Sequence, residues 1–409
     1  MASVAGSAID TQYSAGLASS QDPSGRIWST GQIGASGDLL ATPSMTLVAR
    51  FLPGGGFDPS FQGSGFSRGP AIPAASVWGT AISASATGAT LVEFERDACG
   101  TSCASFFAYA ARRVDFAGAF DPAFGNAGAA PLDIAVTDVV PDAGGGLLVS
   151  GRAATRAAAR RVDATGKGDA VFASNAAAAL DCGGTAQARA SDVKATRLAT
   201  GKLLVAYTLF DAPFTLDALC VTRLNADGTL DATYGNQGRL RIVDTAFAVT
   251  NPAAVLARPD GSAVVVMNFS AALPPNNDFC PASPAKLTLV WATADGRVDV
   301  SRPSAAPQLV TVVAAAIQSD GRLLLVGKPP SEPCAPGPSP TLARLTAEGA
   351  PDATFGAAAN GLVPLVPNGL PLTPAHVIQG IDGAIYVTGT MPQPAGAGFP
   401  RLAVVKLGS

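Results

Sequence analysis

Four residues have side chains suited to acid–base chemistry or to lining a binding site, and they stand near the starts of four separate apolar segments. They are Trp78, Asp138, Asp192 and His376. A histidine beside a carboxylate can transfer protons, and two carboxylates can cleave a glycosidic bond. His376 is the only histidine among 409 residues, so a site with several histidine ligands is excluded. The alternative is that all four have structural or solvated roles.

The composition excludes several classes of protein. Only 14% of residues are charged and the net charge is −3, which gives no basic surface for nucleic acid. Hydrophobic residues make up 48%, enough for a large core. The longest apolar stretch, residues 309–317, is much shorter than the roughly 18 residues of a membrane span. No phosphate-binding loop, dinucleotide fingerprint or nucleophile elbow occurs in a suitable context, so we expect no cofactor and no metal.

The even number of cysteines favours disulfides over a metal site. The six are Cys99, Cys103, Cys182, Cys220, Cys280 and Cys334. Cys99 and Cys103 could form half of a zinc site, but the chain has no second close pair and no histidine nearby. Free buried thiols are the remaining alternative. Disulfides indicate a periplasmic or secreted protein, and we expect an export signal to have been removed ahead of Met1-Ala2-Ser3.

A repeat of about sixty residues runs through the chain. Its first element reads Arg, then an Asp eight residues later, then an aromatic three residues after the Asp, and is clearest in Arg223, Asp231 and Tyr234. The other copies are Asp10/Tyr13, Asp58/Phe61, Asp121/Phe124, Asp169/Phe172, Asp352/Phe355 and a degenerate one with Arg302 three residues after Asp299. Its second element is a glycine followed by an apolar run. These glycines are Gly25, Gly88, Gly146, Gly201, Gly261, Gly321 and Gly383.

The two elements alternate seven times, and each repeat predicts four antiparallel strands, A to D. Strand A ends at the first turn, strand B is the apolar run, strand C carries Ala-Arg-Leu, and strand D carries the Asp-x-x-aromatic. The repeats predict an all-β, seven-bladed β-propeller of four-stranded blades in a single domain, 1–409. The expected blades are 17–66, 75–128, 135–176, 190–240, 250–305, 310–360, and 373–409 joined by 4–16. That N-terminal strand would complete the last blade and close the ring.

Both elements resemble the bacterial delta-60 repeat family of β-propellers. The closest matches are Ser-Asp320-Gly321-Arg-Leu-Leu-Leu-Val-Gly327 and Arg223-Leu-Asn-Ala-Asp-Gly228, and the resemblance covers nearly the whole chain. The copies around Gly88, Gly146 and Asp299 match the repeat less well. The family implies a bacterial, usually exported protein and no single catalytic activity.

The repeated arginines stand eight residues before the repeated aspartates. They are Arg50, Arg113, Arg161, Arg223 and Arg344, and Lys406 takes the comparable place in the last repeat. Across a short hairpin this spacing lets the two side chains pair. We therefore predict a structural Arg–Asp pair in each blade, with a ring of anion or metal sites as the alternative. The repeated aromatics are predicted to pack between blades.

Strand parity places the long connections on one end of the blades. The B–C and D–A connections share this end, which we call the variable face, and the longest are residues 95–106, 210–217, 268–285, 327–340 and 389–400. All six cysteines fall there, and we predict the pairs Cys99–Cys103, Cys280–Cys334 and Cys182–Cys220. Six aromatic residues on this face are candidates for binding: Phe106, Phe107, Phe210, Phe214, Phe279 and Phe399. The alternative is that they fold back onto the blades.

These features favour a non-enzymatic, exported binding or scaffold module that holds a protein or a glycan on the variable face. The runner-up is a polysaccharide hydrolase or lyase that uses carboxylates in the central funnel, where strand A would place Trp78, Asp138, Asp192 and His376. A third reading is a domain of a larger envelope protein. We expect a monomer without nucleic-acid partners, secreted, periplasmic or on the cell surface of a bacterium.

Overall fold

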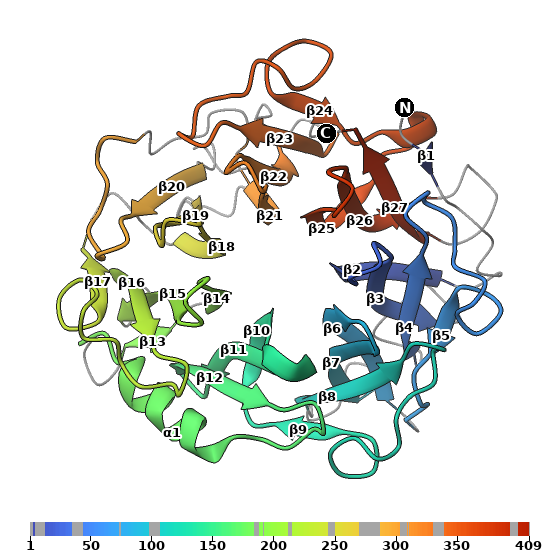
Figure 1. The fold of residues 1–409 in the computed structure, drawn as a ribbon, viewed down its shortest axis with the longest axis horizontal. Helices are drawn as coiled ribbons and strands as arrows, with labels where there is room; N and C mark the ends of the chain where they lie inside the picture. Colours follow the sequence, from blue (N-terminus) through green and yellow to red (C-terminus); the bar gives the residue numbers. More distant parts are fainter. Residues whose placement is uncertain are drawn as a thin grey trace, which may run out of the picture.

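The computed structural model describes residues 3–4, 13–34, 44–72, 75–97, 107–183, 188–190, 192–211, 215–243, 250–269, 287–302, 309, 311–329, 339–392 and 400–408. Within them the chain is all-β, apart from one α-helix and two single-turn 3-10 helices, Ala143–Gly145 and Pro367–Gly369. No helix of these ranges is long and apolar enough to cross a membrane. The sheets lie around a common centre, as Figure 1 shows.

Nearly all strands pair antiparallel with the next strand in the chain. The first sheet holds β2 (Tyr13–Gln21), β3 (Ile27–Gly34), β4 (Ser44–Phe51) and β5 (Phe66–Arg68), and continues into β6 (Ala75–Ser85), β7 (Gly88–Asp97), β8 (Phe107–Asp115) and β9 (Ala130–Leu132). A single parallel pair, Ser44 with Ser76, joins these two groups. The next sheet holds β10 (Ala135–Pro141), β11 (Leu147–Ala153) and β12 (Arg156–Val162).

The remaining four sheets follow the same order. The first of them holds β13 (Arg189–Ala190), β14 (Lys194–Arg197), β15 (Leu203–Asp211), β16 (Thr215–Leu224) and β17 (Arg239–Ile242). It is followed by β18 (Thr250–Ala257), β19 (Ala263–Phe269) and β20 (Leu287–Ala292), and then by β21 (Thr311–Ile317), β22 (Leu323–Lys328), β23 (Thr341–Leu345) and β24 (Leu362–Pro364). The last sheet holds β25 (Thr373–Gln379), β26 (Ile385–Met391), β27 (Arg401–Leu407) and β1 (Ser3–Val4).

The innermost strands form a continuous series of contacts. They are β2, β6, β10, β14, β18, β21 and β25; each contacts the next, and β25 contacts β2 (Figure 1). The second strand of each group is buried on both sides, as in β22, where Leu323, Leu324, Leu325 and Val326 are all buried. A strand that is covered on both faces needs continuous apolar residues, which accounts for the apolar runs after the repeated glycines.

The N-terminal edge strand lies earlier in the chain than the repeat suggested. Ser3 and Val4 pair with Lys406 and Val405 of β27, so the first residues do extend the last sheet. Tyr13, which the repeat placed at the aromatic position of that strand, instead begins β2. Asp10 and the other residues of 5–12 lie outside the described ranges.

The Asp-x-x-aromatic element lies in the turn before the outermost strand and not on that strand. Asp58 and Phe61 precede β5, and Asp352 and Phe355 precede β24. Each Asp accepts a hydrogen bond from the backbone two residues later, as Asp58 does from Ser60 N at 3.0 Å. This Asx-type turn aims the aromatic ring back at the sheet, where Phe61 is fully buried.

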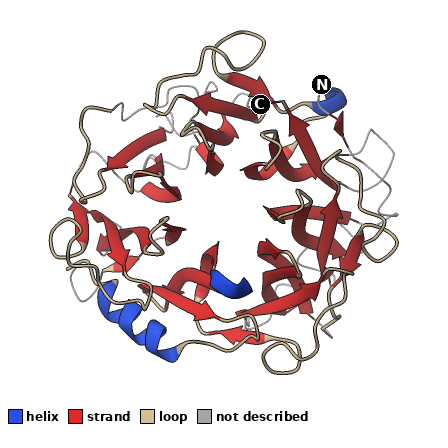
Figure 2. Ribbon diagram, in the orientation of Figure 1, coloured by secondary structure: helices blue, strands red, loops and turns tan. Residues whose placement is uncertain are grey.

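The copy at Asp169 and Phe172 forms a helix where we expected a strand. Helix α1 (Ala170–Ala179) covers the outer side of β12 and also contacts β16 (Figure 2). Asp169 caps it by accepting from Phe172 N at 2.9 Å. Five alanines in the following run favour a helix. In three other copies a glycine at positive φ follows the aromatic residue, such as Gly235 at φ 54°, and Phe172 has no such glycine after it.

The repeated arginine lies between its aspartate and its aromatic ring. Arg223 Nε is 2.5 Å from Asp231 Oδ2, and the guanidinium lies 4.7 Å from the centre of the Tyr234 ring. The same pairs occur at Arg50–Asp58 (2.9 Å), Arg344–Asp352 (2.8 Å) and, more loosely, Arg161–Asp169 (3.6 Å). Arg113 is the exception: among the described residues no ion pair joins it to Asp121. The predicted structural pair is therefore present in four of the five copies.

Within the described residues, all of these cations except Arg344 also reach the following sheet. Arg223 Nη1 donates to Ala294 O at 2.7 Å, in the turn after β20, and Arg113 Nη1 donates to Ala164 O at 2.7 Å, in the turn after β12. Arg50 and Arg161 reach Phe116 O and Ala226 O in the same way. Lys406 Nζ donates at 2.8 Å to Pro53 O, in the turn after β4. We call this contact the cation clip, because it ties one sheet to the turn of the next.

The degenerate copy exchanges the cation and the ring. Trp291 stands where the other copies have Arg, and Arg302 stands where they have the aromatic. Arg302 nevertheless lies 4.9 Å from the centre of the Trp291 ring, its Nε is 3.0 Å from Asp299 Oδ2, and its Nη1 donates to Ala347 O at 2.8 Å. The ion pair, the cation–π contact and the clip therefore all survive with the two side chains swapped.

This exchange predicts a compensating pair of substitutions. Trp291→Arg alone should lower the free energy of unfolding by about 3 kcal/mol, because a buried ring is lost and a second cation is placed beside Arg302. Arg302→Phe alone should cost about 1–2 kcal/mol. The double variant restores the usual order and should be at least about 1 kcal/mol more stable than the sum of the single losses, measured by urea denaturation. Simple additivity of the two losses would show that the contacts are not equivalent.

The aspartates of these pairs predict loss of stability in acid. Burial alone would raise the pKa of Asp231, but hydrogen bonds from Lys202, Thr233 and Arg223 outweigh it and hold the pKa far below its usual range. A carboxyl whose pKa is lower in the folded than in the unfolded state stabilises the fold above the unfolded value, about 3.9, and loses this effect as pH falls through the folded value. Asp231→Asn should cost about 3 kcal/mol at pH 7 and flatten the acid limb of the stability curve.

The matched control is Asp320→Asn, which removes a carboxylate from a more exposed pair with Arg322, side-chain exposure 47% and 39%. It should change the free energy of unfolding by less than about 1 kcal/mol. Equal losses for the two variants, or an unchanged acid limb for Asp231→Asn, would contradict the prediction.

Candidate functional site

A pocket of about 360 Å³ lies at the centre of the molecule, lined by the seven innermost strands. Six of them carry a β-bulge at the pocket, with one extra residue between two register pairs. The extra residues are Leu17, Thr80, Thr137, Ala253, Val313 and Ala375. In the seventh, two separate strands, β13 and β14, pair with β15 in place of one continuous strand. Each bulge falls in the first half of its strand or, in β2 and β6, at the middle of the strand. Bulges re-aim side chains and often border binding sites.

Asp138 and Lys194 join β10 to β14 at this pocket. Asp138 Oδ2 accepts from Ala195 N at 2.9 Å, and Asp138 Oδ1 accepts from Val139 N at 3.0 Å. Lys194 Nζ donates to Thr137 O at 2.7 Å. Burial raises the pKa of Asp138, and the Lys194 charge and the two backbone donors oppose this rise only in part. Both carboxylate oxygens of Asp138 therefore accept hydrogen bonds from backbone N–H groups, one in β10 and one in β14.

His376 is held by a chain of hydroxyl groups. Thr388 Oγ1 donates to Ser19 Oγ at 3.1 Å, and Ser19 Oγ lies 3.0 Å from His376 Nδ1. Among the described residues the Ser19 hydroxyl has no other acceptor for its own proton, so we assign that proton to the bond with Nδ1. This leaves Nδ1 as the acceptor and places the ring proton on Nε2. Burial and the nearby Lys194 charge lower the pKa of His376 to about 4, so the ring is neutral at pH 7.

The described residues of this pocket supply only some of the groups that catalysis needs. Ser19 and His376 resemble a nucleophile and its base, but no carboxylate among the described lining residues orients the ring. Asp138 is the single acid among those residues, whereas glycoside hydrolysis uses two. Within the described ranges no three His, Cys, Asp or Glu side chains gather to hold a metal ion. The arrangement can bind and orient a small molecule.

Trp78 and Asp192 do not line this pocket with Asp138 and His376. Trp78 stands in β6 opposite Phe94 of β7, which stands opposite Tyr109 of β8. The ring centres are 4.6 Å apart for Trp78 and Phe94, and 4.9 Å apart for Phe94 and Tyr109. All three rings are half-buried. They form a row of aromatic rings across the sheet, near its variable face.

Polar groups from the next two sheets lie near this row. Burial raises the pKa of Tyr109, and both Arg152 of β11 and Asp192, which precedes β14, lie close enough to influence it. Arg152 stands near the C-terminal end of β11. The tight turn at Ala154, φ 53°, joins β11 directly to β12, so this sheet ends there. Nε of Arg152 is buried and has no hydrogen-bond partner among the described residues. We call Trp78, Phe94, Tyr109, Arg152 and Asp192 the aromatic shelf.

Most of the predicted binding aromatics lie outside the described ranges: Phe106, Phe214, Phe279 and Phe399. Phe107 begins β8, and nothing is described of its side chain. Phe210 is half-buried in β15, opposite Arg189 on one side and Leu216 on the other. No feature of the sequence indicated Ser19, Lys194, Phe94, Tyr109 and Arg152. Residues alternate along short strands, and this pattern does not show which side chains face the centre.

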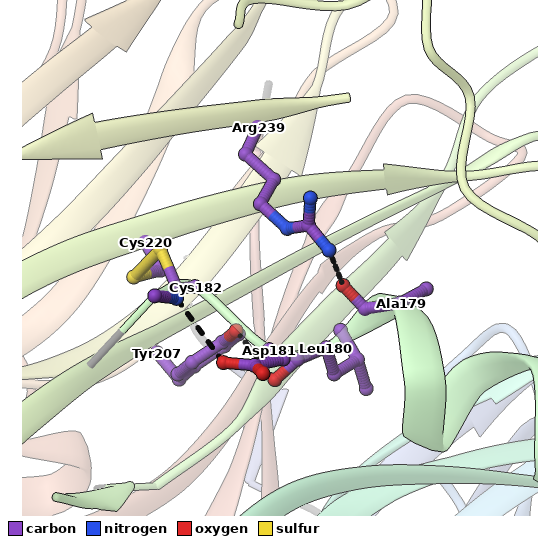
Figure 3. The surroundings of a disulfide bond; sticks show 8 residues. Ala179, Leu180, Asp181, Cys182, Tyr207, Cys220 and Arg239 are labelled. Atoms are coloured by element: carbon purple, nitrogen blue, oxygen red, sulfur yellow. Dashed lines mark hydrogen bonds between the residues drawn. A yellow bond between two sulfur atoms is a disulfide. The ribbon is translucent and has the colours of Figure 1, made fainter. Parts of the chain in front are cut away.

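The predicted disulfide between Cys182 and Cys220 is confirmed. Cys182 follows α1, Cys220 lies in β16, and the S–S distance is 2.05 Å (Figure 3). Tyr207, opposite Cys220 in β15, donates to Leu180 O at 2.9 Å, so a second contact fixes the same segment. The bond ties the end of α1 to the neighbouring sheet. Cys99, Cys103, Cys280 and Cys334 lie outside the described ranges.

Comparison with known proteins gives a family match for one part of the chain. A family model described as a domain of unknown function (DUF5122) β-propeller matches residues 318–355, which contain β22 and β23. No curated protein matches the chain. A solved protein of unknown function from Dyadobacter fermentans is 10% identical, with 100% of this chain and 97% of that chain covered and a TM-score of 0.45. The NanB sialidase from Streptococcus pneumoniae is 9% identical, with 96% and 68% covered and a TM-score of 0.44. Hydrazine synthase from Kuenenia stuttgartiensis is 12% identical, with 73% and 72% covered and a TM-score of 0.43. The family match thus supports a β-propeller of unknown function.

Proposed function

We propose that the chain is an exported bacterial β-propeller of the delta-60 type that binds a glycan through its variable face without catalysis. Its seven four-stranded repeats form one closed ring in this proposal. The disulfide between Cys182 and Cys220 is compatible with an extracellular place of work. We expect the protein to be a monomer, because a closed ring leaves few open strand edges to pair with a second copy.

Contacts between the first and last strands support the closed ring. Ser14 N donates to Pro400 O at 3.1 Å, and Ser14 Oγ accepts from Leu402 N at 3.0 Å. Lys406 clips the last sheet to Pro53 of the first. Together with the pairing of β1 and β27, these bonds join segments more than 350 residues apart in the sequence.

The observation that carries the glycan proposal is the aromatic shelf. Sugar rings stack their C–H faces on aromatic side chains, and their hydroxyl groups need both donors and acceptors. The shelf offers the row Trp78, Phe94 and Tyr109, with a guanidinium donor at Arg152 and a carboxylate acceptor at Asp192 beside it. A protein partner would fit a broad apolar surface better than this mixed set.

Hydrolysis of a polysaccharide is less well supported. A retaining or inverting mechanism needs two carboxyl groups that flank one bond, within about 5–10 Å of each other. In the described lining of the central pocket Asp138 stands alone, and Asp192 is on the shelf. Binding without bond cleavage is therefore our first proposal.

Removing Trp78, the ring of the shelf on the innermost strand β6, tests the glycan proposal. On an array of bacterial and plant polysaccharides, the wild-type protein should bind at least one glycan, and Trp78→Ala should weaken that binding about tenfold or more. Tyr109→Phe keeps the stacking surface and should retain most of the binding. The control is Phe57→Leu, which alters an aromatic ring stacked on Phe51 in the first sheet, away from the shelf.

Three outcomes are informative. Equal binding by Trp78→Ala and the wild type would remove the shelf from the proposal. Capture of a protein partner with no glycan bound would favour the protein alternative. Release of reducing ends from any bound glycan, abolished by Asp138→Asn, would show a hydrolase.

Disulfide mapping tests the expected export. In protein purified from an oxidising compartment, peptide mass mapping without reduction should find Cys182–Cys220 together with Cys99–Cys103 and Cys280–Cys334. The removal of Cys182–Cys220 by Cys182→Ala and Cys220→Ala should cost about 2–4 kcal/mol of stability. A cysteine linked to any of the turns that carry Asp58, Asp231 or Asp352 would contradict the assignment of all six cysteines to the variable face.

A further inference from the structure

The central pocket has hydrogen-bond donors that the protein itself does not use. His376 Nε2 carries the ring proton, because Nδ1 accepts from Ser19, and Nε2 has no hydrogen-bond partner among the described residues. Lys194 Nζ has three N–H groups, and its one hydrogen bond within the described residues is to Thr137 O. A buried or half-buried donor without a partner is costly, so a ligand that supplies acceptors would be stabilised there.

The same pocket offers few free acceptors. Asp138 Oδ1 and Oδ2 each accept from a backbone N–H, and Ser19 Oγ accepts from Thr388. Thr80 Oγ1 donates to Val92 O at 3.2 Å, which turns its proton away from a ligand. The imbalance favours a ligand rich in acceptors over one rich in donors.

The charges in the pocket point to the kind of acceptor. The ammonium group of Lys194 is near enough to both Asp138 and His376 to influence their titration. At pH 7 His376 is neutral, so Lys194 is the one cation among the lining residues that the structure describes. Backbone N–H groups of β10 and β14 hold the Asp138 carboxyl in place. An anionic oxygen is the strongest acceptor for an ammonium donor.

The wall between these two donors is apolar. In the order of the innermost strands, β18 and β21 lie between β14, which holds Lys194, and β25, which holds His376. Their lining residues are Ala253, Ala254, Val255, Leu256, Val313, Ala314 and Ala315. Val313 is 48% exposed, unusual for a large apolar side chain at the centre of a fold. A volume of about 360 Å³ is at the lower end of the range of ligand pockets, about 300–1,000 Å³.

We propose that the central pocket binds a small organic carboxylate, whose oxygens accept from Lys194 Nζ and His376 Nε2 and whose apolar body lies against β18 and β21. This site is separate from the aromatic shelf and does not depend on glycan binding. It would act as a receptor site for a free acid or for the acidic end of a larger molecule that enters from the variable face. The bulges in six of the seven innermost strands would provide the room for it.

The test uses carboxylates and their neutral amides as probes. Hexanoate, cyclohexanecarboxylate and phenylacetate, with hexanamide, cyclohexanecarboxamide and phenylacetamide, are titrated into the full chain by calorimetry and by saturation-transfer NMR. At least one carboxylate should bind, and its amide should bind at least tenfold more weakly. Lys194→Met should weaken the carboxylate at least tenfold, and His376→Leu should weaken it severalfold.

The controls separate loss of the site from loss of the fold. Lys167→Met removes an exposed lysine in the turn after β12 and should leave binding unchanged. If Lys194→Met unfolds, Lys194→Gln keeps a donor for Thr137 O without the charge and should still lose the carboxylate. The phenylacetate resonances should show closer contact to the ring than to the carboxylate-bearing carbon, because the ring faces the apolar wall.

Three results would overturn the proposal: no binding of any carboxylate up to about 10 mM, equal binding of acid and amide, or unchanged binding by both Lys194 variants. The glycan array is read separately on the same variants. Lys194→Met should still bind the glycan, and Trp78→Ala should still bind the carboxylate. Failure of one site therefore does not count as failure of the other.

Discussion

A cation held between a carboxylate and an aromatic ring is the interaction on which the rest of the structure depends. The carboxylate neutralises the charge, the ring covers it, and the remaining N–H groups reach a carbonyl of the next sheet, as Arg223 does with Asp231, Tyr234 and Ala294. Each part compensates for the cost of burying another. Because the clip joins neighbours at their outer turns, the innermost strands stay at a fixed distance from the centre, and a pocket can persist there.

The clip also explains which deviations in the repeat are tolerated. Trp291 and Arg302 exchange positions, and in the last sheet Lys406 takes its acid and its ring from Asp382 and Tyr386, 2.8 Å and 5.3 Å away. The constraint is on the three groups that meet in space and not on their order in the chain. A substitution is therefore tolerated wherever a cation, a carboxylate and an aromatic ring can still meet.

Much of the fold could be predicted from the sequence, because the repeated residues determine the local structure of the backbone. The glycines at positive φ, such as Gly201 and Gly321, mark the turns, and the apolar runs after them mark the buried second strands. The prediction failed where local preference and repeat disagreed: Asp169 and Phe172 fit the pattern, but the alanines behind them form α1. The edge strand Ser3–Val4 carries no repeat residue at all, so its position could not be inferred.

The candidate sites were less predictable, for a geometric reason. Side chains alternate along a strand, and one bulge reverses which of them face the centre. Asp138 and His376 line the central pocket together with Lys194 and Ser19, and these last two differ in no obvious way from other polar residues of short strands. The aromatic shelf depends on the sheet of β11 and β12 ending at the tight turn at Ala154, so that its strands are shorter than those of the sheet beside it. A difference in strand length between two sheets cannot be inferred from one segment of the sequence.

The cation clips all run in the same direction, from one sheet to the following one, and the series has one gap. Arg344 is bonded to Asp352 and Thr354, and among the described residues it donates no hydrogen bond to a turn of the following sheet. The sheets on either side meet through an apolar cluster and a bond from Ser319 N to Gln379 Oε1. Thermal opening should therefore start between β21–β24 and β25–β27. The two ends of the chain would stay together, because Ser3 and Val4 remain paired with β27 and Leu402 N remains bonded to Ser14 Oγ. The sheets would then form an open arc that can close again without refolding its parts.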